Sequence, residues 1–414
     1  MKNIIYTLLV IFAFVACEDQ YETTHKYSRP YTLYKNYPIQ LDAREILVNI
    51  QVKSPIQPGA TFKIASNNNY FFVGEKMRGI HVYEKTDEFH AQPLCFIECQ
   101  YIKAFDVVDN MLYCNNFVDL LAIDVENPLE SKIKHREKNY FNKYNNSAFN
   151  FPNYYNETVD ANVYEIGSKQ AVLTGTETDT SPAPDFSELD ELYGNIIVTQ
   201  IPEALQVAKP YTGFVNVEGK LFTLGDNSLM QCSYTPAGFN ITQSALNIPG
   251  YTSIYVDNLQ YKDGVIFLFG TAGFIYYDYI SAQSQAFPHW YSNALDMISL
   301  KTPANSFAVV WRGSDNYHFI EGIIVNALYN GFAAHAWGAT SLVNVNDIIL
   351  ALGNQLTLYR FYLLSDHRYI EQVKQYSNIS GTSMLKEDDK LIVANRQGLF
   401  FYDISDLEHI TLVP

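Results

Sequence analysis

Seven pairs of short apolar segments recur along this chain with a constant internal spacing. In each pair, a small or polar residue opens the second strand-like segment seven residues after a reference apolar position in the first. The pairs are Phe72 and Gly79, Leu112 and Asp119, Leu221 and Ser228, Ile266 and Gly273, Phe307 and Ser314, Ile348 and Gln355, and Leu391 and Gly398. Successive openings are 40 to 45 residues apart, except for one interval of 109 residues. A repeat of 40 to 45 residues is typical of a four-stranded β-propeller blade.

Each repeat also contains segments for a first and a fourth strand. Thr61 to Ala65 precedes the first pair, and Leu94 to Gln100 follows it. A single four-stranded sheet exposes two edges, whereas a closed ring buries the sheet faces against their neighbours. We therefore predict an all-β fold, a β-propeller of seven blades over residues 45–414. The alternatives are eight blades, if the long interval forms one, and a stack of unrelated hairpins or a β-sandwich.

The last repeat is short. After Asp403, only residues 409–414 remain for a fourth strand. Residues Ile46 to Val52 form a strand-like segment before the first repeat that has no assigned partner. We predict that this N-terminal strand joins the last blade and closes the ring.

Two of the repeats carry a family resemblance. The segments Ile123-Asp124-Val125-Glu126-Asn127 and Tyr402-Asp403-Ile404-Ser405-Asp406 consist of an apolar strand ending in Asp, an apolar residue and then a polar turn. This pattern resembles the LVIVD repeat of bacterial surface propellers. Ser233 and Arg360 replace the acid in two other repeats, so those copies have diverged. The resemblance implies a propeller fold and a surface location, and it implies no particular activity.

The N-terminus has the features of a signal peptide over residues 1–16. Lys2 supplies a positive charge, and Ile4 to Ala16 is an apolar stretch too short to span a bilayer as a helix. Ala16 followed by Cys17 resembles the bacterial lipobox, where the peptidase cuts before a cysteine that carries a diacylglyceryl group. The resemblance implies a membrane anchor at Cys17, with an ordinary signal peptide as the alternative.

The segment after Cys17 is polar. Glu18 and Asp19 resemble the surface-export signal of certain bacterial lipoproteins. We predict that residues 17–44 form a lipidated tether, which places the protein at the cell surface on the outer membrane.

The long interval holds an insertion at about residues 139–205. Its first part, residues 139–162, contains eight Asn, four Tyr and three Phe. Aromatic rings can stack on sugars and Asn can bond to their hydroxyls, although the same rings could simply pack on the ring of blades. We predict that residues 139–194 lie over or beside the central opening and contact a glycan or protein ligand, with Tyr154 and Tyr155 as the candidate binding residues.

Two further groups of residues could suggest a Ca²⁺ site or a disulfide, and we predict neither. Residues 175–194 contain six acids and no Lys or Arg, but they lack the spacing of a Ca²⁺ loop, so we interpret them as a solvated surface. Cys95 and Cys99 are four apart along a strand, too far to bridge without bending it. With Cys114 and Cys232 they are interpreted as small buried apolar residues. We predict no metal site and no cofactor.

Charge and motifs limit the function classes. The formal net charge is −16, and there is no basic run, which argues against a nucleic-acid partner. The sequence has none of the nucleophile, zinc-hydrolase, phosphate-loop or dinucleotide motifs. We therefore predict a cell-surface binding or scaffold module for carbohydrate or protein. The alternative is a hydrolase or lyase that acts on a polysaccharide, with a site assembled from distant loops.

Overall fold

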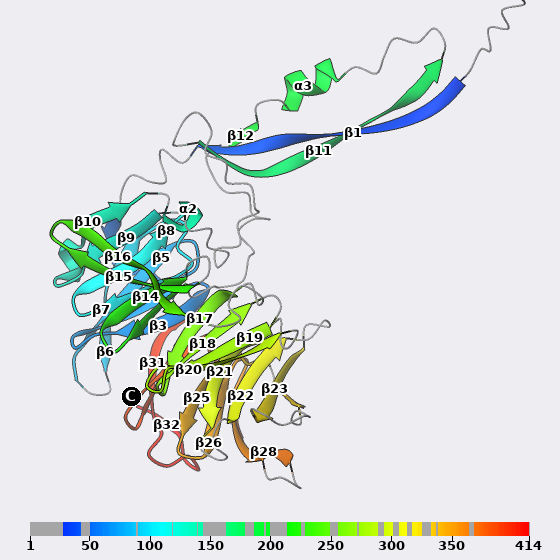
Figure 1. Ribbon diagram of the computed structural model, residues 1–414. Coiled ribbons are helices and arrows are strands. Elements are labelled where there is room, and N and C mark those ends of the chain that lie inside the picture. Colours follow the sequence, from blue (N-terminus) through cyan, green and yellow to red (C-terminus); the bar gives the residue numbers. More distant parts are fainter. Residues whose placement is uncertain are drawn as a thin grey trace, which may run out of the picture. The chain divides into compact units, whose positions relative to one another are not determined.

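The computed structural model divides the chain into two units. The larger comprises residues 41–164 and 199–414, and the smaller comprises residues 1–40 and 165–198 (Figure 1). The structure describes residues 28–42, 50–87, 90–117, 119–138, 140–143, 163–178, 186–193, 196–198, 213–224, 228–248, 256–270, 273–288, 294–300, 306–312, 317–324, 333–336, 338–363 and 368–413.

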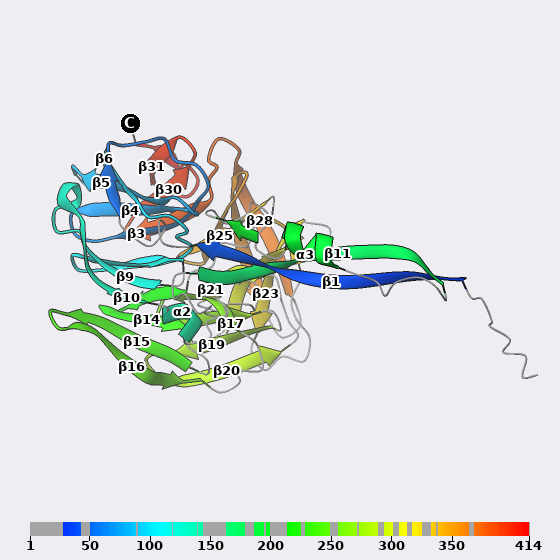
Figure 2. The same cartoon turned by 90° about the horizontal axis from the view of Figure 1, so that it is seen from above.

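The larger unit is a seven-blade β-propeller, as predicted. Its seven antiparallel sheets are arranged around one axis (Figures 1 and 2). Blades 1 to 3 are β3 (Thr61–Ser66), β4 (Tyr70–Glu75), β5 (Gly79–Lys85), β6 (Ala91–Glu98); β7 (Phe105–Val108), β8 (Met111–Asn116), β9 (Asp119–Asp124), β10 (Lys132–Glu137); and β13 (Phe214–Val217), β14 (Lys220–Leu224), β15 (Ser228–Thr235), β16 (Gly238–Asn247). Blades 4 and 5 are β17 (Val256–Lys262), β18 (Val265–Gly270), β19 (Gly273–Asp278), β20 (Gln283–Pro288); and β21 (Ala294–Leu300), β22 (Ser306–Arg312), β23 (His318–Ile324), β24 (Ala333–His335). Blades 6 and 7 are β25 (Ser341–Val345), β26 (Ile348–Leu352), β27 (Leu356–Leu363), β28 (Arg368–Tyr376); and β29 (Ser383–Glu387), β30 (Lys390–Asn395), β31 (Gly398–Asp403), β32 (Thr411–Leu412).

The predicted repeat spacing matches these strands closely. The expected second segments open β5, β9, β15, β19 and β31 at the predicted residues, and β27 one residue later. The fifth repeat is the exception, because β23 begins at His318, whereas the predicted opening at Ser314 lies outside the described residues.

The core lies between the blades. Successive side chains of a strand point to opposite faces of its sheet, so a strand packed on both sides is apolar throughout. On β4, Phe72 packs toward blade 2, in one cluster with Leu112. Its neighbours Phe71 and Val73 pack toward blade 7, in one cluster with Ile392. The apolar runs that reveal the repeat are therefore the strands buried between adjacent sheets.

The ring closes by side-chain contacts between blades 7 and 1. The cluster that contains Phe71 also includes Phe401, with the two ring centroids 5.5 Å apart. The hydroxyl groups of Thr61 and Thr382 are hydrogen-bonded across the junction. The Ser66 hydroxyl donates to Glu387 at 2.7 Å. Apolar packing and a few polar contacts thus join the first and last blades.

The predicted closing strand was placed wrongly. Residues Gln51–Lys53 form β2, which pairs with β6 at the outer edge of blade 1 instead of joining blade 7. Blade 7 has its own fourth strand, because β32 pairs with β31 through Thr411 and Leu412. The eleven residues that follow Asp403 suffice for a turn and a two-residue strand, so the last blade needs no segment from the N-terminus.

The Asp that ends the third strand of several blades has a structural role. Asp124 accepts a hydrogen bond from the backbone N–H of Glu126, and Asp403 accepts one from that of Ser405. Such bonds mimic a backbone turn and favour Asp or Asn at this place. The apolar residue that follows, Val125 or Ile404, is buried. Its N–H donates to a backbone carbonyl in the hairpin between the first two strands of the same blade, that of Asn110 or Asp389.

The smaller unit is a three-stranded sheet that the sequence did not predict. β1 (Ser28–Asp42) lies between β11 (Val163–Thr178) and β12 (Ile196–Val198). Residues 28–42 are therefore a strand, where we predicted a tether over residues 17–44. The insertion supplies the other two strands and does not form an eighth blade. The physical reason is pairing between segments more than 120 residues apart, which no local pattern reveals.

The acidic part of the insertion is partly structured. It contains the helix α3 (Ser187–Tyr193), whose Asp190 bonds to Lys35 and, at 2.5 Å, to the Tyr37 hydroxyl, both on β1. Burial and the Asp190 carboxylate raise the pKa of Tyr37 to about 12. At least this acid therefore attaches the helix to the sheet and is not free surface.

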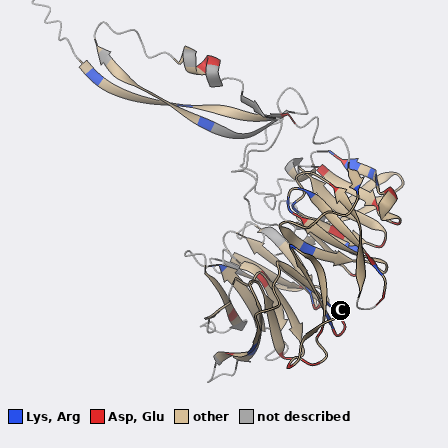
Figure 3. Cartoon of the chain, turned by 180° about the vertical axis from the view of Figure 1, so that it is seen from behind, with Lys and Arg blue, Asp and Glu red and all other residues tan. Residues whose placement is uncertain are grey.

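The other predictions that concern buried and charged residues can be tested on the described part of the chain. Cys95, Cys99, Cys114 and Cys232 are buried and free, as predicted. Charged residues lie mostly at the turns and edges of the blades (Figure 3). Among the described residues, no helix is long and apolar enough to cross a membrane.

Candidate functional site: the central channel

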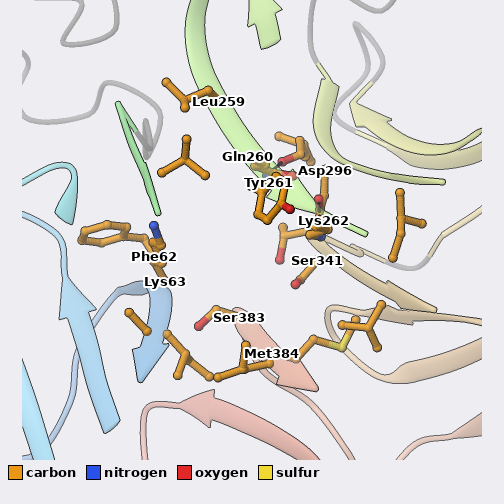
Figure 4. Close-up of a pocket in the computed structure, with 18 of the residues that line it drawn as sticks. Phe62, Lys63, Leu259, Gln260, Tyr261, Lys262, Asp296, Ser341, Ser383 and Met384 are labelled. Atoms are coloured by element: carbon orange, nitrogen blue, oxygen red, sulfur yellow. Dashed lines mark hydrogen bonds and ion pairs between the residues drawn. The ribbon is translucent and has the colours of Figure 1, made fainter. Parts of the chain in front are cut away.

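The seven first strands line a central channel of about 790 Å³. Each of β3, β7, β13, β17, β21, β25 and β29 contributes side chains to it (Figure 4). Because consecutive strands run antiparallel, the turns between second and third strands and the links between blades share one end of the channel, which we call the upper rim. The hairpins between first and second strands lie at the other end, the lower rim.

An ion pair joins the inner strands of blades 1 to 3. Lys63 donates to Asp106 at 2.7 Å and to the backbone carbonyl of Phe214 at 3.3 Å. Asp106 also accepts the backbone N–H groups of Val107, at 2.8 Å, and Asn216, at 2.9 Å. One lysine and one aspartate thus connect three consecutive blades.

A second ion pair joins blades 4 to 6 in the same manner. Lys262 donates to Asp296 at 2.6 Å and to the carbonyl of Leu342 at 2.7 Å. Asp296 accepts the N–H groups of Met297 at 2.7 Å and Leu342 at 2.6 Å. Burial raises the pKa of Asp296, and the Lys262 charge together with these N–H donors opposes that rise. We call the two arrangements the Lys–Asp clamps.

The clamps are similar in sequence as well as in geometry, although the N–H donor of the third strand is Asn216 in one and Leu342, the position equivalent to Phe214, in the other. Each third strand contributes an apolar-Val-Asn-Val segment, Phe214 to Val217 in one clamp and Leu342 to Val345 in the other. In both, the Asn donates to a backbone carbonyl of the preceding inner strand, Asn216 at 2.9 Å and Asn344 at 3.2 Å. The primary role of these charged side chains is therefore to fix neighbouring inner strands against one another.

The clamps bear on the hydrolase alternative. The described lining has three carboxylates, of which Asp106 and Asp296 are each held by a lysine and two backbone N–H groups. The third, Asp263, lies in an exposed hairpin at the lower rim. Within this lining, no two carboxylates are free to share the acid and base roles that glycoside hydrolysis requires.

Hydroxyl groups line the upper rim between blades 6, 7 and 1. The Thr340 hydroxyl donates to the carbonyl of Thr382 at 3.1 Å, and the Thr382 hydroxyl contacts that of Thr61. Ser341 and Ser383 follow the first two of these threonines and also line the cavity (Figure 4).

Three polar atoms in the channel are buried without a hydrogen-bond partner among the described residues. They are Ser383 Oγ, Gln260 Oε1 and Asn344 Oδ1. Buried polar groups are nearly always paired, so an unpaired atom on a side chain that lines a cavity indicates a place where water or a ligand can bind once the side chain turns toward it.

The lining also carries cations that are not used by the clamps. Lys76 and Arg312 lie at the upper rim and Lys386 near the lower rim, and none of them has an ion pair within the described part of the chain. The Nδ1–H group of His318 donates to the carbonyl of Ala339, 2.6 Å away. In a chain with a net charge of −16, this lining stands out by having more lysine and arginine than acid.

The site residues predicted from the sequence, Cys17, Tyr154 and Tyr155, lie outside the described residues, so the structure does not test them. At the start of the insertion, α2 (Tyr140–Lys143) packs on blade 3: the Tyr140 hydroxyl bonds to Thr223 at 2.6 Å, and both Tyr140 and Phe141 are buried. These two rings therefore pack on the propeller and are not available to a ligand.

Sequence reasoning missed the channel residues. The signal that could have indicated them is the repeated Thr-Ser pair at the start of an inner strand, at Thr340-Ser341 and Thr382-Ser383. No group of three or more His, Cys, Asp or Glu that could hold a metal ion occurs among the described residues.

No protein-family model matches the chain, and no curated protein sequence matches it. Several solved structures are similar in general architecture. BamB from Moraxella catarrhalis is 6% identical, with a TM-score of 0.42, and the match covers 90% of this chain and 96% of that one. A chain of the Mitotic Checkpoint Complex is 11% identical, with a TM-score of 0.49 and coverage of 86% and 91%. The extracellular domain of a one-component system from B. thetaiotaomicron is 13% identical, with a TM-score of 0.41; the match covers 85% of this chain but only 39% of the other. At these identities, ligand and activity have to be argued from the channel itself.

Proposed function

We propose that this protein is a binding module of the cell surface whose ligand is a carbohydrate held in the central channel. The observation that carries the proposal is the set of buried polar atoms without partners in the channel: Ser383 Oγ, Gln260 Oε1 and Asn344 Oδ1. Together they can offer one hydroxyl and two amide oxygens to a ligand. A polyhydroxylated molecule supplies many donors and acceptors at close spacing and can satisfy all three.

The rest of the lining suits the same class of ligand. Binding pockets are mainly apolar, with a few well-placed polar groups that orient the ligand. Here Phe62, Tyr261 and Met384 provide apolar surface beside the serines and amides (Figure 4). Tyr261 lines the channel with its aromatic ring, on which a sugar can stack, and its hydroxyl lies 3.5 Å from Glu218.

The experiment that tests this proposal is a glycan array followed by calorimetry with the purified protein. Gln260→Met removes the unpaired amide oxygen and keeps the length of the side chain. We expect the variant to bind its best glycan at least tenfold more weakly at an unchanged melting temperature. Gln355→Met is the matched control, because Gln355 also has a buried unpaired amide atom but does not line the channel. Equal losses in both variants, or no glycan bound at all, would overturn the proposal.

We also propose that the protein is anchored by lipid at Cys17. This rests on the order of Lys2, the apolar stretch and Ala16-Cys17. A lipidated cysteine carries several acyl chains, which give stable membrane binding where a single chain is marginal. Cys17→Ala should move the protein from the membrane fraction to the soluble fraction. A variant that still sediments with membranes after a high-salt wash would show that the anchor lies elsewhere.

A further inference from the structure

The outer hairpin of blade 6, formed by β27 and β28, is longer than the corresponding part of other blades. In blades 2, 4 and 7 the third strand ends at the turn-forming Asp, which is Asp124, Asp278 or Asp403. In blade 6, Arg360 stands at this position and β27 continues to Leu363. Blade 6 therefore carries an extension of its outer hairpin that the repeat itself does not require.

The two faces of this extension have different surroundings. Phe361 and Ile370 are paired across the strands and pack on the apolar cluster between blades 5 and 6. Because side chains alternate along a strand, the next pair, Tyr362 and Tyr369, lies on the opposite face. Blade 7 contacts that face near the other end of the hairpin, where the Tyr376 hydroxyl donates to a backbone carbonyl of blade 7 at 2.7 Å. Tyr369 is left 49% exposed.

Tyr362 and Tyr369 form a parallel stack, which we call the tyrosine stack. Their ring centroids are 4.3 Å apart and their planes are inclined by 18°. β28 is the last strand of its sheet, so no described strand lies beyond Tyr369. Since Tyr362 covers one face of the Tyr369 ring, the exposed half of that side chain comprises its other face and the hydroxyl edge. The stack thus presents a flat aromatic surface at the outer edge of the blade.

Polar contacts fix the orientation of the tyrosine stack. The Tyr362 hydroxyl donates to Glu371 Oε2 at 2.9 Å and accepts from Arg360 Nη1 at 3.4 Å. The same guanidinium nitrogen lies 3.6 Å from Glu371 Oε2, and both charged side chains are nearly half exposed. Within the described part of the chain, Glu371 Oε1 has no hydrogen bond or ion pair. The carboxylate therefore holds the stack with one oxygen and can accept from a ligand with the other.

The size of this group of side chains limits what it can bind. Arg360 and Glu371 are directly opposite each other, and so are Tyr362 and Tyr369. Neighbouring strands and alternate residues place the four side chains in an array of about 5 Å by 7 Å. A stable protein interface buries roughly 1,600 Å², far more than such an array offers. One sugar ring covers a tyrosine ring, and its hydroxyls reach a carboxylate beside it.

A nucleobase could also stack on an exposed tyrosine, but the charge is unfavourable. Nucleic-acid binding requires cations that neutralise phosphates. This chain has a net charge of −16, and the one cation of the array, Arg360, already lies beside Glu371. An uncharged, polyhydroxylated ligand fits the array better.

We propose that the outer hairpin of blade 6 is a second carbohydrate-binding site, in which a sugar ring stacks on Tyr369 and donates a hydroxyl to Glu371. Tyr362 and Arg360 are positioning residues that hold the ring and the carboxylate. None of these four described residues lines the channel, so the site is separate and rests on the proposed function only for its class of ligand. Two sites on one molecule would hold a polysaccharide at two points and raise the avidity.

A glycan array followed by calorimetry tests the second site. Gln260→Met weakens the channel, and we expect this variant to keep binding at least one glycan of the array. Adding Tyr369→Ala should weaken that glycan about tenfold, the size of one aromatic stacking contact. The melting temperature should stay within about 1 °C, because the change is at the surface. Adding Tyr369→Phe instead keeps the ring and should leave the affinity within about threefold.

Three further variants in the same background assign the effect to the array. Tyr34→Ala is the matched control, because it removes an exposed tyrosine from β1 of the smaller unit and should change the affinity less than about twofold. Arg360→Met should weaken the glycan about threefold, since Glu371 and Tyr362 lose a partner. Arg360→Lys restores a charge beside Glu371 and should recover most of this loss.

The outcomes separate the second site from the channel. Binding that is lost in Gln260→Met and unchanged in Tyr369→Ala would overturn the second site and leave the proposed function standing. Binding that is lost in Tyr369→Ala and unchanged in Gln260→Met would support the second site and contradict the channel. Equal losses in Tyr369→Ala and Tyr34→Ala would overturn the second site, and a wild-type protein that binds no glycan would overturn both.

Sedimentation tests whether the tyrosine stack instead contacts a second copy of the chain. We expect the wild type and Tyr369→Ala to have the same oligomeric state. A wild-type dimer that becomes monomeric in Tyr369→Ala would show that the stack is an interface between copies and would overturn the carbohydrate site.

Discussion

The substitution Asp296→Asn should destabilise the propeller measurably, because it breaks the second Lys–Asp clamp without changing the shape of the side chain. The carboxylate accepts from Lys262 and from two backbone N–H groups, of Met297 and Leu342. An amide has one oxygen and one NH₂ group. Whichever way it turns, the NH₂ faces a donor, so that at least one hydrogen bond is lost and Lys262 loses its counter-charge.

The magnitude follows from burial. Removing one partner of a buried ion pair costs about 3–5 kcal/mol, because the other charge is left uncompensated. The Asp296 side chain is 4% exposed but that of Lys262 is 23% exposed, so the ammonium can still reach water. We therefore expect a loss near the lower limit, about 3 kcal/mol. For a unit of roughly 340 residues, unfolding entropy of about 2.1 cal/mol/K per residue converts this loss into a decrease in Tm of roughly 4 °C.

Thermal unfolding followed by circular dichroism measures the effect. Asp347→Asn is the control, since it removes the same charge from an exposed hairpin and should leave Tm unchanged within about 1 °C. Asp106→Asn, in the equivalent clamp, should resemble Asp296→Asn. A Tm for Asp296→Asn within 1 °C of the wild type would refute the reasoning, because the clamp would then contribute no net stability.

Two further predictions concern residues outside the clamps. Lys103 has a folded-state pKa lowered by burial to about 7, against 10.5 when unfolded, so the unfolded chain binds more protons between these values and stability should rise from pH 7 to about 10.5. In Lys103→Met, Tm measured across this range should rise less than in the wild type; an identical slope would show that Lys103 is not the group responsible. Changing Tyr154 and Tyr155 to Ala should weaken binding of the glycan found on the array by tenfold or more at an unchanged Tm. Unaltered affinity would show that these tyrosines make no contact with the ligand.

The repeat could be predicted because its cause is local. A strand packed between two sheets must be apolar on both faces, and the hairpins restrict its length, so the pattern returns every 40 to 45 residues. The turn after the third strand is also local, as Asp124 and Asp403 show by bonding two residues ahead. Even the fifth repeat, in which β23 begins at His318, forms a four-stranded blade.

The site could not be predicted because its parts meet only in the ring. Lys262 and Leu342 are 80 residues apart, and Thr61 and Thr382 are 321 apart. Nothing in either local sequence distinguishes a clamp lysine from an exposed one. The pairing of β1 with β11 and β12 could not be predicted for the same reason. The sequence of a segment shows its tendency to form a strand. The strand with which it pairs depends on which sheet edge is free in the folded chain.

The placement of β2 leads to a last prediction, about what keeps the ring closed. β2 is three residues long, lies at the outer edge of blade 1 and pairs Val52 with Ile97. Val52→Pro removes one backbone donor from this edge and should cost only about 1 kcal/mol, the value of one hydrogen bond. Phe71→Ala instead removes a buried ring that packs on Phe401 between blades 7 and 1, and large-to-small changes of this kind cost about 3–5 kcal/mol.

Urea unfolding of the two variants compares these costs directly. If side-chain packing closes the ring, Phe71→Ala should lower the midpoint clearly more than Val52→Pro. If an N-terminal strand closes the ring, Val52→Pro should lower the midpoint more than Phe71→Ala. The proline would then disrupt the junction that holds the ring closed. A larger loss in Val52→Pro would therefore contradict closure by the Phe71 cluster and restore the N-terminal strand to that role.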